Sequence, residues 1–298
     1  RVEGAARQRG TEQAMAASGA SIDYETEYNN LARVPEYPQI HAQLLKDSAA
    51  AREVMSGELD IPYGDTPRER YDLFTAKQTS GKAPLAVFIH GGVWQRGDRK
   101  DYSLYARELA AKGVDVAMPS HTLCPQATVA QIYDELRRFM KALWEKTGRH
   151  PTVVGHSVGG AMAAAMLATD WSAQGGVPAD LVRSAYAISG VFEIEPYVHT
   201  SYNKAVGLDV ESARAASPAL WPPPPKDRVF VAAVGGSESR EFLRQSIDQA
   251  ARWSAAGVKA ECVVIPGANH FTVLDDLTRP ESAMLHRIKN LAKDALSG

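Results

Sequence analysis

The chain has 298 residues, 45% of them hydrophobic, and a formal net charge of −2. A chain of this length and apolar content can bury a large core, and an α/β architecture of this size is commonly a single domain. The near-neutral charge gives no electrostatic reason to expect a nucleic-acid partner. The apolar run from Ala161 to Ala168 is too short to cross a bilayer, so no membrane partner is expected either.

The two cysteines, Cys124 and Cys262, lie far apart in the sequence. A disulfide framework is therefore not expected, and a reducing, cytoplasmic compartment fits the composition better. We find no charged and then apolar leader with a cleavage site, although a leader that had been removed would not be visible. The sequence does not indicate an oligomeric state, so a homodimer stays an open alternative.

Residues 1–20 are rich in Ala, Gly and Arg and are expected to form a flexible extension, which leaves 21–298 as one domain. Downstream of about Glu58 the chain alternates between strand-like and helix-like segments. The expected strands are Glu58–Ile61, Tyr71–Thr75, Leu85–Ile89, Val114–Met118, Thr152–Val154, Val182–Ile188, Val229–Val234 and Glu261–Ile265. Several are continuous apolar runs, as in parallel strands covered on both faces, whereas the first two are more polar and favour an antiparallel edge.

Helix-like segments separate these strands. Apolar residues recur at helical spacing over 129–143, and Thr128 with Gln131 forms a capping-box pattern before them. Gly113 is a suitable C-cap for an earlier helix, and 284–295 forms a final amphipathic helix. The alternation predicts a doubly wound, mainly parallel eight-stranded sheet with helices on both faces. In such a sheet the ligand site lies at the carboxyl ends of the strands.

The interval 191–226 is long and contains no clear strand. A segment of that length inside a compact domain is usually functional. We therefore expect a short lid or cap over the site, with an ordinary surface loop containing one short helix as the alternative.

The most informative motif is Gly155-His156-Ser157-Val158-Gly159, between an apolar strand and a helix of small residues. A tight turn there strains the serine backbone and exposes its hydroxyl at the edge of the sheet, and side chains at the flanking glycines would collide with neighbouring elements. The pattern indicates that Ser157 is a nucleophile. The alternative is a serine that caps the helix in a glycine-rich turn.

A serine nucleophile needs a base, and the base needs an orienting acid, in the chain order Ser, acid, His. His270 follows the last strand in a glycine-containing loop and is the expected base. The expected acid is Glu238, the first acidic residue after the seventh strand. Glu241 remains a rival because it lies one turn later, and so do Glu193 and Glu195, which follow the sixth strand.

The oxyanion of the tetrahedral intermediate needs preorganised backbone donors. We expect them from the amide of Val158, directly after the nucleophile, and from the amides of Gly92 and Val93 after the third strand. Gly91 should let the backbone approach the substrate closely. Trp94 is expected to form a wall of the acyl pocket, with plain packing in the core as an equal alternative. His90 is expected to anchor this loop through hydrogen bonds rather than to act as a base.

Taken together, these motifs resemble the α/β-hydrolase family and, more narrowly, its kynurenine formamidase (arylformamidase) and small-esterase branch. The narrower resemblance is carried by Tyr28-Asn29-Asn30, Val34-Pro35-Glu36, His90-Gly91-Gly92-Val93-Trp94, Leu123-Cys124-Pro125, Gly155 to Gly160, Ser189-Gly190-Val191-Phe192, Glu241 to Ser246 and Asn269-His270-Phe271. It implies the nucleophile, acid and base Ser157, Glu238 and His270. Two positions depart from the family pattern: Glu238 stands where many members have aspartate, and His121 stands where a tyrosine commonly opens a loop near the pocket.

These observations predict a serine hydrolase without cofactor or metal, acting on a small ester or an aryl formamide. A carboxylesterase or a carbamate or amide hydrolase for another small aromatic substrate is the alternative, since the same triad serves each carbonyl. A catalytically silent fold that binds a ligand is a second alternative. Metal-dependent hydrolysis is not expected, because the sequence has no H-x-H or H-E-x-x-H pattern. Pocket shape, and hence the substrate, should depend on the lid and the N-terminal segment.

Overall fold

A computed structural model describes residues 21–76 and 82–297 of the chain, so the expected extension at 1–20 lies outside the described residues. The described residues form an eight-stranded sheet with the order β1-β2-β4-β3-β5-β6-β7-β8. The strands are β1 (Gly57–Pro62), β2 (Arg70–Phe74), β3 (Leu85–Ile89), β4 (Asp115–Pro119), β5 (Pro151–His156), β6 (Ser184–Ile188), β7 (Val229–Gly235) and β8 (Lys259–Ile265). All eight predicted strands are confirmed, with ends shifted by a few residues.

The direction of each strand pairing follows the polarity pattern of the sequence. β1 and β2 pair antiparallel, and β2 pairs antiparallel with β4, which confirms the predicted antiparallel edge. The pairs from β4 through β3, β5, β6 and β7 to β8 are parallel. Central strands such as β3 and β5 are buried along their whole length, whereas the residues of the edge strand β8 are exposed or half-buried. The apolar runs therefore lie in the middle of the sheet, where helices cover both faces.

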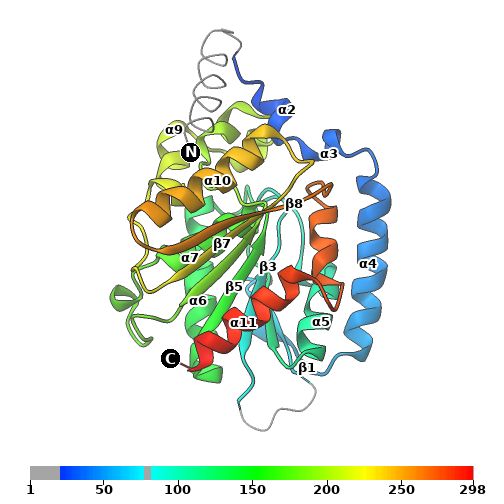
Figure 1. The fold of residues 1–298 in the computed structure, drawn as a ribbon, viewed down its shortest axis with the longest axis vertical. Coiled ribbons are helices and arrows are strands. Elements are labelled where there is room, and N and C mark those ends of the chain that lie inside the picture. Colours follow the sequence, from blue (N-terminus) through cyan, green and yellow to red (C-terminus); the bar gives the residue numbers. More distant parts are fainter. Residues whose placement is uncertain (1–20, 77–81, 298) are drawn as a thin grey trace, which may run out of the picture.

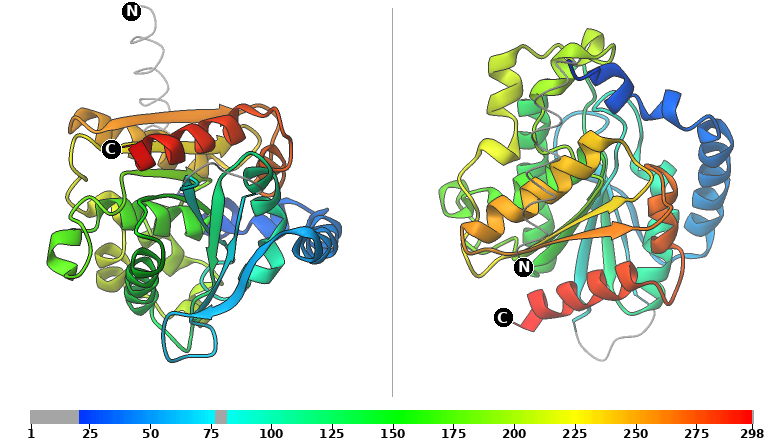
Figure 2. Two further views of the ribbon diagram at one scale, coloured as in Figure 1. Left: turned by 90° about the horizontal axis from the view of Figure 1, so that it is seen from below. Right: turned by 45° about the horizontal axis from the view of Figure 1, so that its top comes forward.

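Helices cover both faces of the sheet (Figures 1 and 2). One face packs against α6 (Val129–Thr147), α7 (Val158–Ala168) and α10 (Arg240–Ala255). The other packs against α5 (Leu104–Ala111), the 3-10 helix η5 (Thr272–Leu277) and α11 (Ala283–Ser297). The predicted capping box of α6 is present, and α5 ends at Ala111, two residues before Gly113 with its φ of 87°.

The N-terminal part of the described chain is helical and lies beside the carboxyl ends of the parallel strands. It contains α2 (Tyr24–Tyr28), α3 (Asn30–Arg33) and the long helix α4 (Tyr37–Val54). In Figure 1 these helices, drawn in blue, run from the top of the molecule down one side. Within residues 21–76 and 82–297, none of the helices is both long and apolar enough to traverse a lipid bilayer.

The interval 191–226, called the lid segment below, connects β6 to β7 and packs against the N-terminal helices. Its short helices are η3 (Glu195–His199), α8 (Asn203–Val206), α9 (Val210–Ala215) and η4 (Pro218–Leu220). The carboxylate of Glu25 accepts hydrogen bonds from the amide and hydroxyl of Ser201 at 2.7 and 2.8 Å. The rings of Tyr28 and Tyr197 lie 4.9 Å apart. The lid segment and α2 therefore form one layer above the strand ends.

Candidate active site

The turn between β5 and α7 has the strained geometry that the sequence predicts. Ser157 has φ 57° and ψ −126°, a conformation that costs a non-glycine residue about 1–3 kcal/mol. A Cβ atom on Gly155 would lie 1.9 Å from the carbonyl oxygen of Gly159, and one on Gly159 would lie 2.2 Å from that of Ile89. Only glycine fits at both positions, so the two flanking residues let the turn lie directly against the sheet.

Three side chains predicted from the sequence lie in series at the carboxyl ends of β5, β7 and β8. The hydroxyl of Ser157 lies 3.1 Å from Nε2 of His270, and Nδ1 of His270 lies 2.7 Å from Oε2 of Glu238. All three residues are buried. The other carboxylate oxygen of Glu238 accepts hydrogen bonds from the hydroxyl of Ser189 at 2.6 Å and from the amide of Gly235 at 2.7 Å. These bonds leave Oε2 directed at the imidazole.

The rival carboxylates have other partners. Glu193 pairs with Arg244 at 2.9 Å, and Glu195 pairs with Arg214. Glu241 also pairs with Arg244 at 2.9 Å and accepts a hydrogen bond from the hydroxyl of Tyr28 at 3.0 Å. The carboxylate that His270 contacts belongs to Glu238. The geometry therefore favours Glu238 over its rivals.

His156, within the serine motif, supports the backbone of His270. Its Nε2 donates a hydrogen bond to the carbonyl of His270 at 2.8 Å, and the two rings lie 4.8 Å apart. Burial, reinforced by the neighbouring His270, holds the pKa of His156 well below the usual range, so this imidazole stays neutral. His156 therefore positions the loop that carries His270.

The segment 90–97 after β3, called the glycine loop below, lies against the serine turn. Gly92 and Val93 line the same cavity as Ser157, with φ of 118° and 54°. In the part of the chain that the structure describes, neither amide donates to a carbonyl or side chain. A Cβ on Gly91 would lie 3.0 Å from Cβ of Ser157, so this glycine permits the close approach. The amide of Val158 is in the first turn of α7, where no intrahelical carbonyl accepts it.

His90 anchors the glycine loop, as the sequence predicts. Its Nδ1 donates to the carbonyl of Gly91 at 2.7 Å, and burial lowers its pKa to about 4. Its ring stacks on His121, whose Nδ1 donates to the carbonyl of Thr122 at 2.7 Å and whose pKa burial lowers to about 3. His121 packs behind His90 and does not belong to the cavity lining, so its departure from the family pattern acts through the loop.

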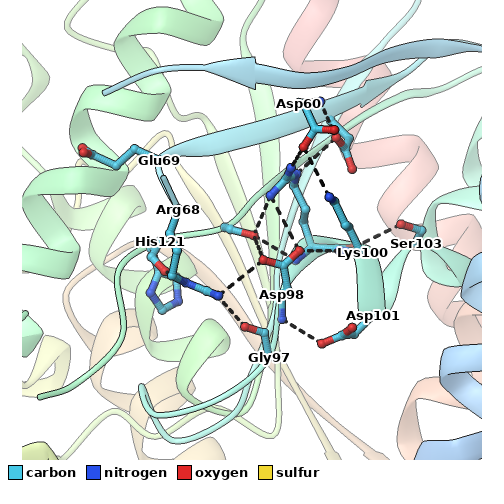
Figure 3. A network of polar contacts seen from close by, with 12 residues as sticks. Asp60, Arg68, Glu69, Gly97, Asp98, Lys100, Asp101, Ser103 and His121 are labelled. Atoms are coloured by element: carbon cyan, nitrogen blue, oxygen red, sulfur yellow. Dashed lines mark hydrogen bonds and ion pairs between the residues drawn. The ribbon is translucent and has the colours of Figure 1, made fainter. Parts of the chain in front are cut away.

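Charged side chains hold the far end of the glycine loop (Figure 3). Arg68 donates to the carbonyl of Gly97 at 2.6 Å and lies 3.4 Å from Asp98. The next residue, Arg99, binds the fully buried Asp72 of β2 at 3.1 Å. These contacts tie the far end of the loop to the antiparallel edge of the sheet and so hold that end in place.

Of the two alternatives for Trp94, the structure favours packing in the core over a wall of the acyl pocket. Its side chain is fully buried in the core, and it is not among the described residues that line the cavity. The ring packs edge-on against Tyr197 at 5.6 Å, and the Trp94 carbonyl accepts the amide of Cys124 at 2.7 Å. The backbone of Trp94 has a positive φ of 55°. Gly91 likewise contacts the serine turn rather than the cavity.

A cavity of about 680 Å³, including its open mouth, lies over Ser157. Apart from Ser157, His270 and the glycine loop, its walls are mainly aromatic. The rings belong to Tyr28, Tyr37, Tyr102, Tyr105, Tyr197, Tyr202 and Phe271. They come from the N-terminal helices, the lid segment and the segments after β3 and β8. The aromatic character of the cavity suits a small, flat organic molecule.

Sequence reasoning missed some residues of this site. Ser189, which supports Glu238, has a φ of 50°, and a serine before Gly190 directly after a predicted strand could have signalled it. Arg96 also lines the cavity, and no sequence pattern other than its position in the glycine loop indicates that it belongs to the site. For metals, the described ranges contain no group of three His, Cys, Asp or Glu side chains placed to hold an ion.

Comparison with known proteins agrees with this architecture. Residues 86–274 match the family model described as the alpha/beta hydrolase fold. Kynurenine formamidase of Salmo salar is 29% identical over 245 residues, which cover 80% of this chain and 83% of that protein. Kynurenine formamidase of Danio rerio is 26% identical over 244 residues, with the same coverage of 80% and 83%.

Among solved structures, a Silicibacter protein superposes with a TM-score of 0.79 and 26% identity, covering 93% of this chain and 100% of that one. The family model spans well over half of the chain, and it includes the serine turn, Glu238 and His270. The chain therefore belongs to the α/β-hydrolase fold family.

Proposed function

We propose that the protein is a serine hydrolase that cleaves a small ester or an aryl formamide, as a kynurenine formamidase does, through an acyl-enzyme on Ser157. The observation that carries the proposal is the series of contacts from Ser157 through His270 to Glu238, at 3.1 and 2.7 Å. A silent binding fold has no need for these three groups in line. The similarity to kynurenine formamidases over 80% of the chain supports the formamide as substrate.

In the first half of the reaction, Nε2 of His270 accepts the proton of Ser157 as Oγ attacks the carbonyl carbon. Glu238 orients the imidazole and stabilises its cation. The amides of Gly92, Val93 and Val158 are the proposed donors to the oxyanion, and each such donor contributes about 3 kcal/mol in other serine hydrolases. His270 then donates its proton to the leaving amine or alcohol, and the C–N or C–O bond breaks.

In the second half, His270 accepts a proton from a water molecule, which attacks the acyl-enzyme. The tetrahedral intermediate collapses, Ser157 regains its proton from His270, and the acid is released. For an aryl formamide the products are formate and an arylamine. The aromatic walls of the cavity would bind the aryl ring of the leaving group.

The free thiols of Cys124 and Cys262 support a reducing, cytoplasmic location for this reaction.

The test compares kcat/KM for N-formylkynurenine with kcat/KM for p-nitrophenyl acetate and butyrate. We expect the formamide to be preferred, and Ser157→Ala to lower kcat at least about 10³-fold on every substrate, because the acyl-enzyme can no longer form. Thermal unfolding checks that the variant is folded. Labelling by a fluorophosphonate should occur in the wild type and be lost in the variant.

Near wild-type turnover by folded Ser157→Ala would refute the mechanism. Turnover of the esters alone would retain the mechanism and reject the formamide as substrate.

A further inference from the structure

The cavity over Ser157 has an uneven distribution of charge. The described residues that line it include no aspartate or glutamate. Among these lining residues, Arg96 is the one arginine, and there is no lysine. The other basic side chains that line the cavity are histidines, and burial holds His156 in its neutral form. A ligand in this cavity therefore meets one permanent positive charge that no lining carboxylate neutralises.

The guanidinium of Arg96 has no anionic partner. Over the described ranges no carboxylate lies within ion-pair distance of it, whereas Arg99 and Arg244 in the same protein are bound by two or more carboxylates each. The guanidinium lies 5.7 Å from the centroid of the Tyr202 ring and also interacts with the hydroxyl of that neutral phenol. Arg96 is only partly exposed. A half-buried guanidinium against a neutral phenol has lost part of its hydration without gaining an opposite charge.

The backbone presents this side chain from a rigid turn. The amide of Arg96 donates to the carbonyl of Gly92 at 3.0 Å, and the preceding Gln95 donates through its side chain to the carbonyl of Tyr202 at 2.7 Å. On the other side, Arg68 holds the carbonyl of Gly97 at 2.6 Å. One short loop, with its backbone held at both ends, therefore carries both the proposed oxyanion donors and the cation that has no carboxylate partner.

We propose that Arg96 binds a carboxylate of the substrate, so that the enzyme selects aryl formamides or aryl esters whose aromatic ring carries a carboxylate directly or on a short side chain. This inference rests on the proposed hydrolase function of the same cavity. A guanidinium offers paired N–H donors that match a carboxylate, and the aromatic surroundings strengthen the interaction relative to water. N-formylkynurenine carries such a carboxylate on its side chain.

The kinetic test uses matched substrates: 3-formamidobenzoate against formanilide, and 3-acetoxybenzoate against phenyl acetate. We expect Arg96→Gln to lower the acid-to-neutral ratio of kcat/KM by about ten- to a hundredfold, mainly through KM for the acids. Arg96→Lys should retain part of the ratio, because it keeps the charge. Arg107→Gln, on the exposed face of α5 and outside the cavity, is the matched control and should leave the ratio unchanged.

A measurement on the wild type adds independent evidence. Raising the salt concentration should raise KM for the two acids and leave KM for the neutral partners nearly constant, because salt screens the ion pair. If Arg96→Gln lowers both members of each pair by the same factor, or if salt affects them equally, Arg96 supports only the loop and the inference is overturned.

Binding to Ser157→Ala separates this inference from the proposed function. Calorimetric titration should show 3-aminobenzoate binding at least tenfold more tightly than the isosteric, neutral 3-aminobenzamide, and Ser157→Ala/Arg96→Gln should lose the difference. Selective binding in a protein whose wild type hydrolyses none of the substrates would reject the hydrolase function and keep the anion site. Ser157-dependent turnover with equal binding of the two ligands would keep the function and reject the anion site.

Discussion

Glu238 shows how one residue acquires its role from its surroundings. One carboxylate oxygen is held by Ser189 and the amide of Gly235, and the other faces Nδ1 of His270. The orientation of the imidazole therefore depends on a carboxylate that is itself fixed by two donors. Glutamate is one methylene longer than aspartate, and here the side chain folds back on its own strand end, where Gly235 leaves room for it.

Replacing the acid should affect catalysis far more than stability. We expect Glu238→Gln to lower kcat on the order of 10³-fold or more, because the amide cannot stabilise the imidazolium and favours the wrong tautomer of His270. Glu193→Gln is the control for the rival acid: it pairs with arginines on α10 and should change kcat less than about threefold. A larger loss in Glu193→Gln than in Glu238→Gln would contradict the assignment.

At the scale of elements, the site depends on how closely α7 and the glycine loop approach the sheet. Gly155, Gly159 and Gly91 each occupy a position where a Cβ would lie 3.0 Å or less from a neighbouring backbone or side-chain atom. The strained backbone of Ser157 is held between β5 and α7, and its amide donates to the carbonyl of Ile188 on β6 at 2.8 Å. Close packing of these elements thus fixes the position of the hydroxyl.

Adding one methyl group at this contact should separate the elements. We expect Gly159→Ala to lower the free energy of unfolding by at least about 3 kcal/mol, because its Cβ would lie 2.2 Å from a strand carbonyl that cannot move. Gly148→Ala has open space around it and should cost only about 1–2 kcal/mol for its φ of 57°. Urea unfolding measures both, and equal losses would show that steric contact is not the cause.

At the scale of the whole molecule, the parallel sheet brings distant segments to one edge. The carboxyl ends of β5, β7 and β8 supply Ser157, Glu238 and His270, and the N-terminal helices and the lid segment close the cavity above them (Figures 1 and 2). His90, the first residue of the glycine loop, stacks on His121, and this buried pair belongs to the packing of the same edge. The free energy of unfolding should therefore depend on whether these two imidazoles are protonated.

Stability should fall on acidification. The pKa values of His90 and His121 are lowered in the folded state to about 4 and about 3 from the ordinary 6.5. The unfolded chain therefore binds more protons below pH 6.5, and stability present at pH 7 is lost as the pH falls toward 4. We expect a loss of about 4 kcal/mol between pH 7 and pH 5 from these two residues.

Urea unfolding at the two pH values measures this loss. His121→Phe, which keeps a ring but cannot titrate, should reduce the loss between pH 7 and pH 5 by about 2 kcal/mol, because one of the buried, neutral imidazoles is removed. His286→Gln, on the exposed face of α11, is the control and should leave the difference intact. Equal stability of the wild type at pH 5 and pH 7 would contradict the prediction.

Some of this protein could be read directly from short segments of sequence. The eight strands and the parallel centre of the sheet follow from apolar runs and their spacing, since burial on both faces demands continuous apolar residues. The serine turn is equally local, because five consecutive residues carry both the nucleophile and the glycines that permit its strained backbone. His270 followed from its place after the last strand.

Other features were decided only by the tertiary structure. Sequence order left Glu238, Glu241 and Glu193 as rivals, and the structure distinguishes them by the partners that each carboxylate meets across the fold. The sequence left a cavity wall and core packing as equal alternatives for Trp94, and its burial against Tyr197, more than a hundred positions away in the chain, decides for the core. The aromatic walls and Arg96 also emerged only on folding, since contacts between residues more than a hundred positions apart depend on packing rather than on local pattern.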